Sequence, residues 1–108
     1  MELQQIKNVF STSLSPAANQ DGKSKLAAVM IVIYSSEPKI IMTERPKSMN
    51  QHAGEISFPG GKWKDDDTDL LETARRETKE EIDLEISRDQ IIGQLVPVTT
   101  LNSGFKIT

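Results

Sequence analysis

The stretch FPGGKWKDDDTDLLETARRETKEEIDL, residues 58–84, decides the fold of this 108-residue chain. Its second half predicts an amphipathic helix from about Asp69 to Ile82. Asp69 is a favoured N-cap residue, and Glu72 follows three positions later, as in a capping box. Asp83 stands where a left-handed residue often ends a helix. We therefore expect one well-capped helix soon after a Pro-Gly-Gly turn. Its buried stripe is expected to consist of Leu71, Ala74, Thr78 and Ile82.

The segments around this helix predict strands and loops. A continuous β-branched, apolar run predicts a strand buried on both faces, and the next strand is expected to pair with it as a hairpin. In chain order, we expect an amphipathic helix at 2–10, a loop at 11–25, strands at 25–34 and 39–45, an extended piece at 56–58, a strand at 91–100 interrupted by Pro97, and the start of another strand at 105–108.

Composition limits the classes of protein to which the chain can belong. With 36% hydrophobic and 27% charged residues it is typical of one globular domain. A net charge of -3 argues against a general nucleic-acid binder. Its longest apolar run, 26–34, is too short to span a membrane, and residues 1–10 lack the apolar core of a secretory signal. The absence of cysteine excludes disulfides and favours a reducing compartment, so a cytoplasmic location is expected.

Three glutamates of the predicted helix, Glu77, Glu80 and Glu81, share one face, because residues three and four apart are neighbours on a helix. One interpretation is an ordinary solvated face, in which Arg76 pairs with Glu80 and the next lysine with Asp83. The other is a site for Mg²⁺ or Mn²⁺, hard cations that prefer carboxylate oxygens and are often shared with phosphates.

The paired glycines before the helix favour the second interpretation. Gly60 and Gly61 let the backbone approach a ligand closely, with a carbonyl available to a metal and N–H groups available to phosphate oxygens. A Gly-Gly turn alone is a weak signal. Followed by a capped helix with an E-x-x-E-E pattern directly after Arg76, it becomes a specific one.

These residues resemble the Nudix box, G-x5-E-x7-R-E-U-x-E-E-x-G-U, in which U is aliphatic. Gly61 matches the leading glycine, and residues 76–84 match the second half. The spacing from Gly61 to the arginine is one residue longer than usual. Thr68 stands in place of the first glutamate, Thr78 in an aliphatic position, and Asp83 in place of the late glycine.

The preceding stretch, IMTERPKSMNQHAGEISFPGG at 41–61, resembles the extended signature L-L-T-x-R-S-x3-R-x3-G-x3-F-P-G-G of coenzyme A pyrophosphatases, a Nudix subfamily. Pro46 replaces the serine of that signature, and Asn50 replaces its second arginine. The resemblance extends over roughly residues 26–108. The positions in register are Thr43, Arg45, Gly54, Phe58, Pro59, Gly60 and Gly61.

The resemblance implies an α+β fold, the Nudix-type α/β/α sandwich with a mixed sheet. Residues 1–25 would form an N-terminal helix and loop, and 26–108 the Nudix domain. Further strands and a C-terminal helix would follow Thr108, so the domain is expected to be cut short. With the open strand edge left by such a cut, the chain is expected to form a homodimer, to be poorly stable, or to be a fragment of a longer protein.

The resemblance also implies roles for individual residues. Mg²⁺, or Mn²⁺, would be held by carboxylates and one carbonyl, while Arg76 would orient a glutamate. The general base stays open between Glu81, Glu55 and a group beyond the chain. Expected metal ligands are Glu77, Glu80, Glu81 and Gly61; expected catalytic residues are Glu81, Arg76 and Glu77; expected substrate contacts are Arg45, Gly54, Phe58, Gly60 and Lys62.

The implied activity is Mg²⁺-dependent hydrolysis of the diphosphate of coenzyme A, or of a derivative, to 3',5'-ADP and 4'-phosphopantetheine. The partner would be this small nucleoside diphosphate, with no role for nucleic acid or a membrane. Two alternatives stay open: a Nudix hydrolase of another nucleoside diphosphate derivative, and an inactive fragment that binds metal or nucleotide without turnover.

Several residues near the motif have simpler explanations. His52 is expected to make a local hydrogen bond rather than contact phosphate. Trp63 is expected to cover the core rather than stack on a base. The aspartates 65–67 are expected to cap the helix rather than hold a second metal ion. Arg45, Lys47, Lys62 and Lys64 are expected to form either a basic patch for a 3'-phosphate or a solvated surface.

Overall fold

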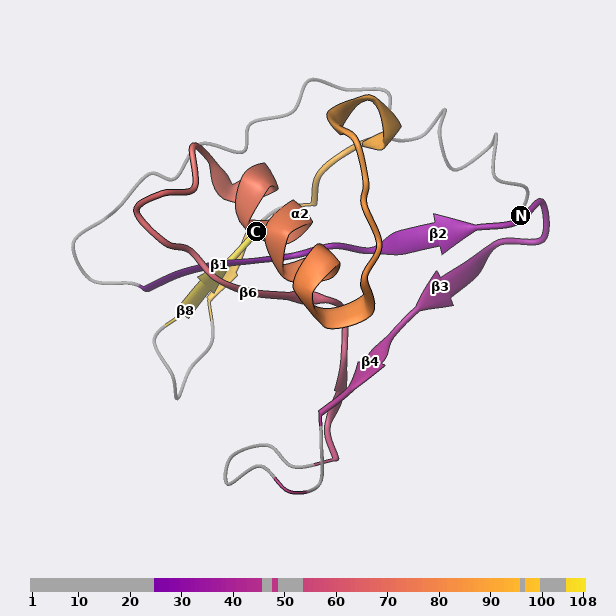
Figure 1. The fold of residues 1–108 in the computed structure, drawn as a ribbon, viewed down its shortest axis with the longest axis horizontal. Helices are drawn as coiled ribbons and strands as arrows, with labels where there is room; N and C mark the ends of the chain where they lie inside the picture. The colour runs from indigo at the N-terminus through magenta and orange to yellow at the C-terminus, as the bar shows by residue number, and fades with distance from the viewer. Residues whose placement is uncertain (1–24, 46–47, 49–53, 96, 100–104) are drawn as a thin grey trace.

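The structure, a computed structural model, describes residues 25–45, 48, 54–95, 97–99 and 105–108 (Figure 1). The helix predicted at 2–10 and nearly all of the loop at 11–25 lie outside these ranges, as do His52, Asn50 and Lys47. The described elements are β1 (Lys25–Val29), β2 (Val32–Tyr34), β3 (Lys39–Ile41), β4 (Thr43–Glu44), β5 (Ile56–Ser57), β6 (Gly60–Lys62), α2 (Leu70–Ile82), η1 (Arg88–Gln90), β7 (Val98–Thr99) and β8 (Phe105–Ile107).

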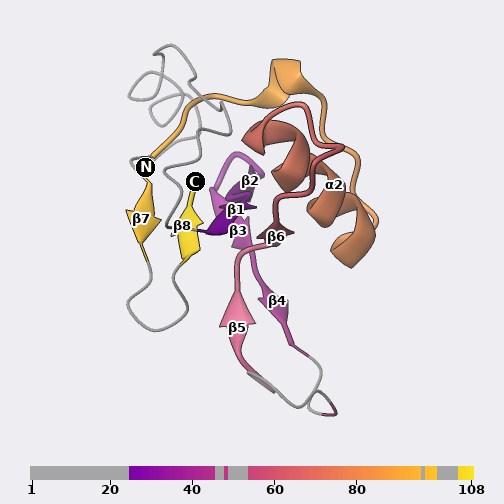
Figure 2. The same cartoon turned by 90° about the vertical axis from the view of Figure 1, so that its left-hand side faces the viewer.

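The largest sheet has the strand order β6-β1-β8-β7. Strand β1 runs antiparallel to β6 and parallel to β8, and β7 runs antiparallel to β8, so the sheet is mixed. Helix α2 packs against β1 and β6, whereas β7 and β8 form the far edge of the sheet (Figure 2). The described part of the chain is therefore α+β, with one helical layer on a mixed sheet. The second helical layer of the expected sandwich stays a prediction.

The apolar run predicted as one strand at 25–34 is two strands, so that prediction was wrong at its centre. Strand β1 ends at Val29 and β2 begins at Val32, because the two halves pair with different neighbours. Between them, the Met30 N–H donates to the Pro59 carbonyl at 2.7 Å. Strand β2 then pairs with β3 as the expected antiparallel hairpin. Residues 26–33 are all apolar, so nothing in the local pattern marks the change of partner.

A second hairpin, β4–β5, carries the chain toward the glycine pair. Its register places Thr43 opposite Ser57. Beyond the paired strands, the Arg45 N–H donates to the Glu55 carbonyl at 2.8 Å. The extended piece predicted at 56–58 is confirmed in part, since β5 covers Ile56–Ser57.

The core lies between β1 and α2. Its buried members from β1 and the residue after it are Leu26, Ala28 and Met30, and those from α2 are Leu70, Leu71 and Ala74. Alternation along a strand sends every second side chain to the same face, which explains the spacing of the first three. Two threonines of α2, at positions 73 and 78, are also fully buried, with 0% exposure. Trp63 packs against this core, as predicted.

Helix α2 begins and ends close to the predicted positions. The Asp69 side chain accepts a hydrogen bond from the Glu72 N–H at 2.9 Å, which satisfies one of the free donors of the first turn. Asp83 adopts the left-handed conformation at φ 53°, and its N–H donates to the Lys79 carbonyl. Both caps are therefore confirmed.

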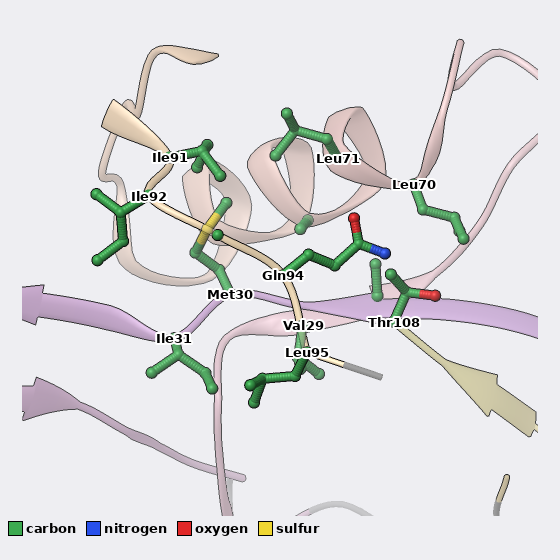
Figure 3. A pocket seen from close by; sticks show the side chains of 13 residues that line it. Val29, Met30, Ile31, Leu70, Leu71, Ile91, Ile92, Gln94, Leu95 and Thr108 are labelled. Carbon is green, nitrogen blue, oxygen red and sulfur yellow. The ribbon is translucent and has the colours of Figure 1, made fainter. Parts of the chain in front are cut away.

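The strand predicted at 91–100 is short in the structure. Residues 91–95 have no regular secondary structure and lie across α2, and in the described part of this range Val98–Thr99 form a strand, β7. An apolar cavity of about 160 Å³ is lined by residues of this segment, α2 and β1 (Figure 3). Its labelled lining includes Met30, Leu71 and Ile91. Apolar residues here serve packing on a helix rather than a sheet, and sequence pattern does not separate the two. The strand predicted at 105–108 is confirmed by β8.

In the described ranges, no helix has both the length and the apolar character needed to cross a membrane.

Candidate metal centre

The three glutamates of the motif lie on the last two turns of α2. Glu77 is largely enclosed, with a side chain 17% exposed, whereas the Glu80 side chain is 53% exposed. Glu81 is also exposed. Since residues three and four apart share a helix face, the carboxylates form one band of negative charge.

The predicted Pro-Gly-Gly turn is a strand, which corrects the expected local structure. After the buried Pro59, Gly60 pairs with Val29 and Gly61 with Ala28, in antiparallel register with β1. Glycine is required here by close approach rather than by a turn. A Cβ on Gly60 would lie only 2.6 Å from the Val29 Cα and closer still to the Ala28 carbonyl oxygen.

The same glycine pair lies directly beneath the carboxylates. A Cβ on Gly61 would lie 2.5 Å from the Glu77 Cδ and 2.8 Å from both of its carboxylate oxygens. The backbone of Gly60 hydrogen-bonds the Glu81 carboxylate. Strand β6 and the end of α2 therefore bring the predicted Gly61, Glu77 and Glu81 together, and the glycines leave the space that the carboxylates occupy.

Arg76 hydrogen-bonds Glu77, one of the glutamates that it is expected to orient. Its Nη1 donates to Glu77 Oε1 at 2.8 Å and lies 3.6 Å from Glu80 Oε2. Its Nη2 donates to the Lys62 carbonyl at 3.0 Å. The ion pairs of the simpler interpretation are also present, since Lys79 Nζ lies 3.4 Å from Asp83 Oδ1. Charge pairing on this face and a metal site are thus compatible.

Glu81 has a raised pKa. The first cause is partial withdrawal of its carboxyl from water, although the residue as a whole is exposed, and the second is the negative charge of Glu77. The Gly60 hydrogen bond and the positive charge of Arg45 oppose the rise. Repulsion from Glu77 is the second cause of the rise, and an added cation would relieve it.

The chemistry of this donor set fits Mg²⁺ or Mn²⁺, because it offers carboxylate oxygens beside a backbone carbonyl. In the part of the chain that the structure describes, no three His, Cys, Asp or Glu side chains converge closely enough to hold a metal ion as they stand. Binding would therefore require Glu80, and with it Glu81, to turn toward Glu77. Both residues are exposed.

The expected substrate contacts lie in two places. Arg45 and Gly54, the latter at φ 75°, face each other at the end of the β4–β5 hairpin where its connecting loop begins, and the Gly54 N–H donates to the Arg45 carbonyl at 2.9 Å. The partly buried Phe58 links this hairpin to β6. Arg45 is close enough to Glu81 for its positive charge to favour the ionised form of that carboxyl.

Lys62 lies on the other face of the sheet. Successive strand residues alternate between faces, so the neighbour of Gly61 points away from Glu77. The Lys62 Nζ lies 5.6 Å from the centre of the Phe105 ring, and Lys25 Nζ lies at the same distance. The structure therefore does not bring the Lys62 side chain to the carboxylates, although its carbonyl binds Arg76.

The prediction that the aspartates at 65–67 cap the helix was wrong. Asp69 caps α2, while the buried Asp67 accepts hydrogen bonds from Arg76 Nε and Nη2, both at 2.9 Å. Sequence reasoning missed this pair because the partners are nine positions apart, beyond the spacing of neighbours on a helix. Three successive aspartates also look alike in sequence, and only the chain path from Trp63 to α2 distinguishes them.

Comparison with known families supports the same interpretation of the motif. Residues 24–106 match the model of the NUDIX domain. This range holds β6, α2 and all the residues of the candidate metal centre.

Individual relatives agree. A protein of Yersinia enterocolitica is 41% identical over 83 residues, which cover 76% of this chain and 42% of that protein. Proteins of Yersinia pestis and Yersinia pseudotuberculosis are 36% identical over 109 residues, covering 100% of this chain and 52% of theirs. All three bear the name uncharacterized Nudix hydrolase NudL. The chain spans about half the length of these relatives. From the domain match and these identities, the chain belongs to the Nudix hydrolase family.

Proposed function

We propose that this chain carries the metal-binding part of a Mg²⁺-dependent Nudix pyrophosphohydrolase that cleaves the diphosphate of coenzyme A or its derivatives. The observation that carries the proposal is the packing of the Glu77 carboxylate against Gly61, with Arg76 fixing its orientation. Mn²⁺ is a second candidate cofactor, because it prefers similar ligands.

The bound cation would neutralise diphosphate charge and lower the pKa of a water molecule. The chain's own residues would supply the rest of the site. Arg76 hydrogen-bonds a Glu77 oxygen, and the β6 backbone would offer the carbonyl of Gly61. The charge of Arg45, at the loop end of the β4–β5 hairpin, would attract an anionic substrate.

In the proposed reaction, one water molecule attacks a phosphorus of the diphosphate bridge and one bridging P–O bond breaks. The products are 3',5'-ADP and 4'-phosphopantetheine, and the proton of the water goes to a general base. Glu81 is a candidate because its pKa is raised toward the range in which a carboxylate accepts a proton effectively. Glu55 and groups in a longer form of the protein remain candidates.

The test is incubation with coenzyme A and Mg²⁺, followed by chromatographic separation of the two products. We expect turnover that EDTA abolishes and Mn²⁺ restores. Glu77→Gln should lower turnover by about 100-fold or more, since even partners of metal ligands typically contribute about 10- to 100-fold. Glu85→Gln, at an exposed position after the helix, is the matched control and should leave turnover unchanged.

The alternatives give different results in the same assay. Cleavage of sugar or dinucleotide diphosphates in preference to coenzyme A would indicate a Nudix hydrolase with another substrate. Cation binding without products would indicate a fragment that binds the cation but does not catalyse hydrolysis. This alternative stays open because the chain covers about half the length of its relatives. Unchanged turnover in Glu77→Gln would contradict the proposed site.

A further inference from the structure

Asp67 is the most enclosed carboxylate among those that contact Arg76. Its side chain is 6% exposed, against 17% for Glu77 and 53% for Glu80. Oδ1 accepts from Arg76 Nε and Oδ2 accepts from Nη2, both at 2.9 Å. Two parallel bonds of this kind fix the plane of a guanidinium group as well as its position.

The Asp67 carboxylate is itself immobilised by two further donors. Its Oδ2 accepts from the Lys64 N–H at 3.0 Å and from the Thr73 hydroxyl at 2.9 Å. Thr73 is fully buried in α2, so this contact ties the carboxylate to the helix core. The hydrogen bonds from Arg76 are the main cause that lowers the pKa of Asp67 to about 2, which keeps this carboxylate charged at neutral pH.

Fixing this face of Arg76 determines where its remaining nitrogen points. The guanidinium group is planar. When its Nε and Nη2 atoms are both hydrogen-bonded to Asp67, the direction in which Nη1 points is also fixed. Nη1 donates to Glu77 Oε1 at 2.8 Å. The Glu77 carboxylate in turn fills the space above Gly61. A chain of contacts therefore runs from Asp67 through Arg76 to the candidate metal ligand.

We propose that Asp67 is a positioning residue of the metal centre: by holding the Arg76 guanidinium in a fork, it sets the orientation in which Glu77 meets the divalent cation. The proposal rests on the proposed function, because it assumes that Glu77 binds the cation. Asp67 itself would touch neither cation nor substrate.

A purely structural role makes a different prediction. Asp67 also joins the loop at 64–67 to α2, so losing its charge should lower stability in either case. Only a positioning role also weakens cation binding in protein that remains folded. The test must therefore measure cation affinity and folding separately.

The experiment compares four variants of the protein by Mn²⁺ titration, with calorimetry or the electron paramagnetic resonance of free Mn²⁺ as readout. Asp67→Asn keeps the size of the side chain but removes its charge. Asp66→Asn is the matched control, an exposed neighbour in the same run of aspartates. Glu77→Gln reports on the metal site itself. Arg76→Lys keeps a positive charge but cannot form the fork.

Circular dichroism at the titration temperature establishes that each variant is folded. The emission of Trp63 reports on the loop, because this sole tryptophan donates from Nε1 to the Asp67 carbonyl at 3.2 Å. We expect Asp67→Asn and Arg76→Lys to weaken Mn²⁺ binding by about 10- to 100-fold, as is typical for residues that orient metal ligands. Asp66→Asn should bind as the unaltered protein does.

Unaltered Mn²⁺ affinity in folded Asp67→Asn, together with weakened binding in Glu77→Gln, would overturn the positioning role and leave the metal site intact. Unaltered affinity in Glu77→Gln would instead overturn the proposed function from which this inference starts. If Asp67→Asn does not fold, Arg76→Lys decides, and unaltered affinity there overturns the positioning role.

Discussion

Acidic residues at the two ends of helix α2 have opposite electrostatic surroundings. Near the beginning, the pKa of Asp67 is lowered to about 2, first by hydrogen bonds from Arg76. The pKa of Asp69 is also lowered: burial opposes the change, but hydrogen bonds from Arg88 and from the backbone outweigh it. Near the end, the pKa of Glu81 is raised.

The difference shows how one helix can use carboxylates for two purposes. At the beginning of α2, each acid meets a cation or a backbone donor, so its charge stabilises the fold. At the end, Glu77 and Glu80 share Arg76, and Glu81 experiences the repulsion of both. Such crowding costs stability unless a cation enters. Arg76 lies between the two groups and contacts both.

The largest expected effect is a difference in turnover between variants at the two ends of α2. Glu81→Gln should lower turnover by about 100- to 10,000-fold, the range for loss of a general base, because it removes a group that is either base or ligand. Glu72→Gln is the matched change at the other end, where Glu72 pairs with Arg75 at 2.6 Å and with Arg88 at 3.0 Å. The Glu72→Gln variant should leave turnover unchanged in a steady-state assay of product formation. Equal losses in both variants would remove the functional distinction.

The second effect concerns the glycine pair beneath the acidic end. Gly60→Ala should lower the free energy of unfolding by about 3 kcal/mol, because its Cβ would meet the backbone of β1. The nearest atoms to the Cβ of Gly61→Ala belong to the Glu77 side chain rather than to the backbone, so the loss should be nearer 1 kcal/mol. Urea unfolding monitored by Trp63 emission measures both values.

For Mn²⁺ binding at the candidate metal centre, we expect the opposite order: Gly61→Ala should be impaired more than Gly60→Ala. Displacing the Glu77 carboxylate should make Gly61→Ala the poorer Mn²⁺ binder of the two in any folded sample. A variant of Gly61 that binds Mn²⁺ normally would show that the contact between Glu77 and β6 is incidental.

A third prediction uses the lowered pKa of Asp67. A folded-state pKa of about 2, against 3.8 for the free side chain, corresponds to about 2 kcal/mol of stability. Because the folded pKa is the lower one, this contribution is present above about pH 4 and is lost as the pH falls toward 2. The difference in unfolding free energy between the unaltered protein and Asp67→Asn should shrink by about 1 kcal/mol between pH 7 and pH 3. A constant difference over that range would mean that the ionised carboxylate is not the stabilising form.

Local sequence signals predicted the elements whose determinants are local. The caps at Asp69 and Asp83, the helix between them and the β2–β3 hairpin depend on neighbouring residues, and all are confirmed. The glutamate face follows from helical spacing alone, so its position on α2 was also predictable.

Features set by distant contacts could not be predicted in this way. The break between β1 and β2 arises because the two halves pair with different strands. The strand conformation of Gly60 and Gly61 depends on β1, about 30 positions earlier in the chain, where pairing rather than propensity decides the outcome. The role of Asp67 depends on a loop that folds back onto α2. In each case the residue types are compatible with the observed structure, but the partner segment is too distant in the sequence for a local pattern to reveal it.

The smallest expected effect comes from changing Asp69, the N-cap at the beginning of α2. Asp69→Ala removes the N-cap and should lower the free energy of unfolding by about 1 kcal/mol. Asp69→Asn should lower it by less, because asparagine caps a helix about as well as aspartate and only the ion pair with Arg88, at 3.0 Å, loses its charge. Mn²⁺ affinity should be unaltered in both variants, since Asp69 contacts none of the candidate ligands that the structure describes. Weakened Mn²⁺ binding in the folded Asp69→Asn variant would mean that the two ends of α2 are coupled, and that the stabilising acids also tune the metal-binding ones.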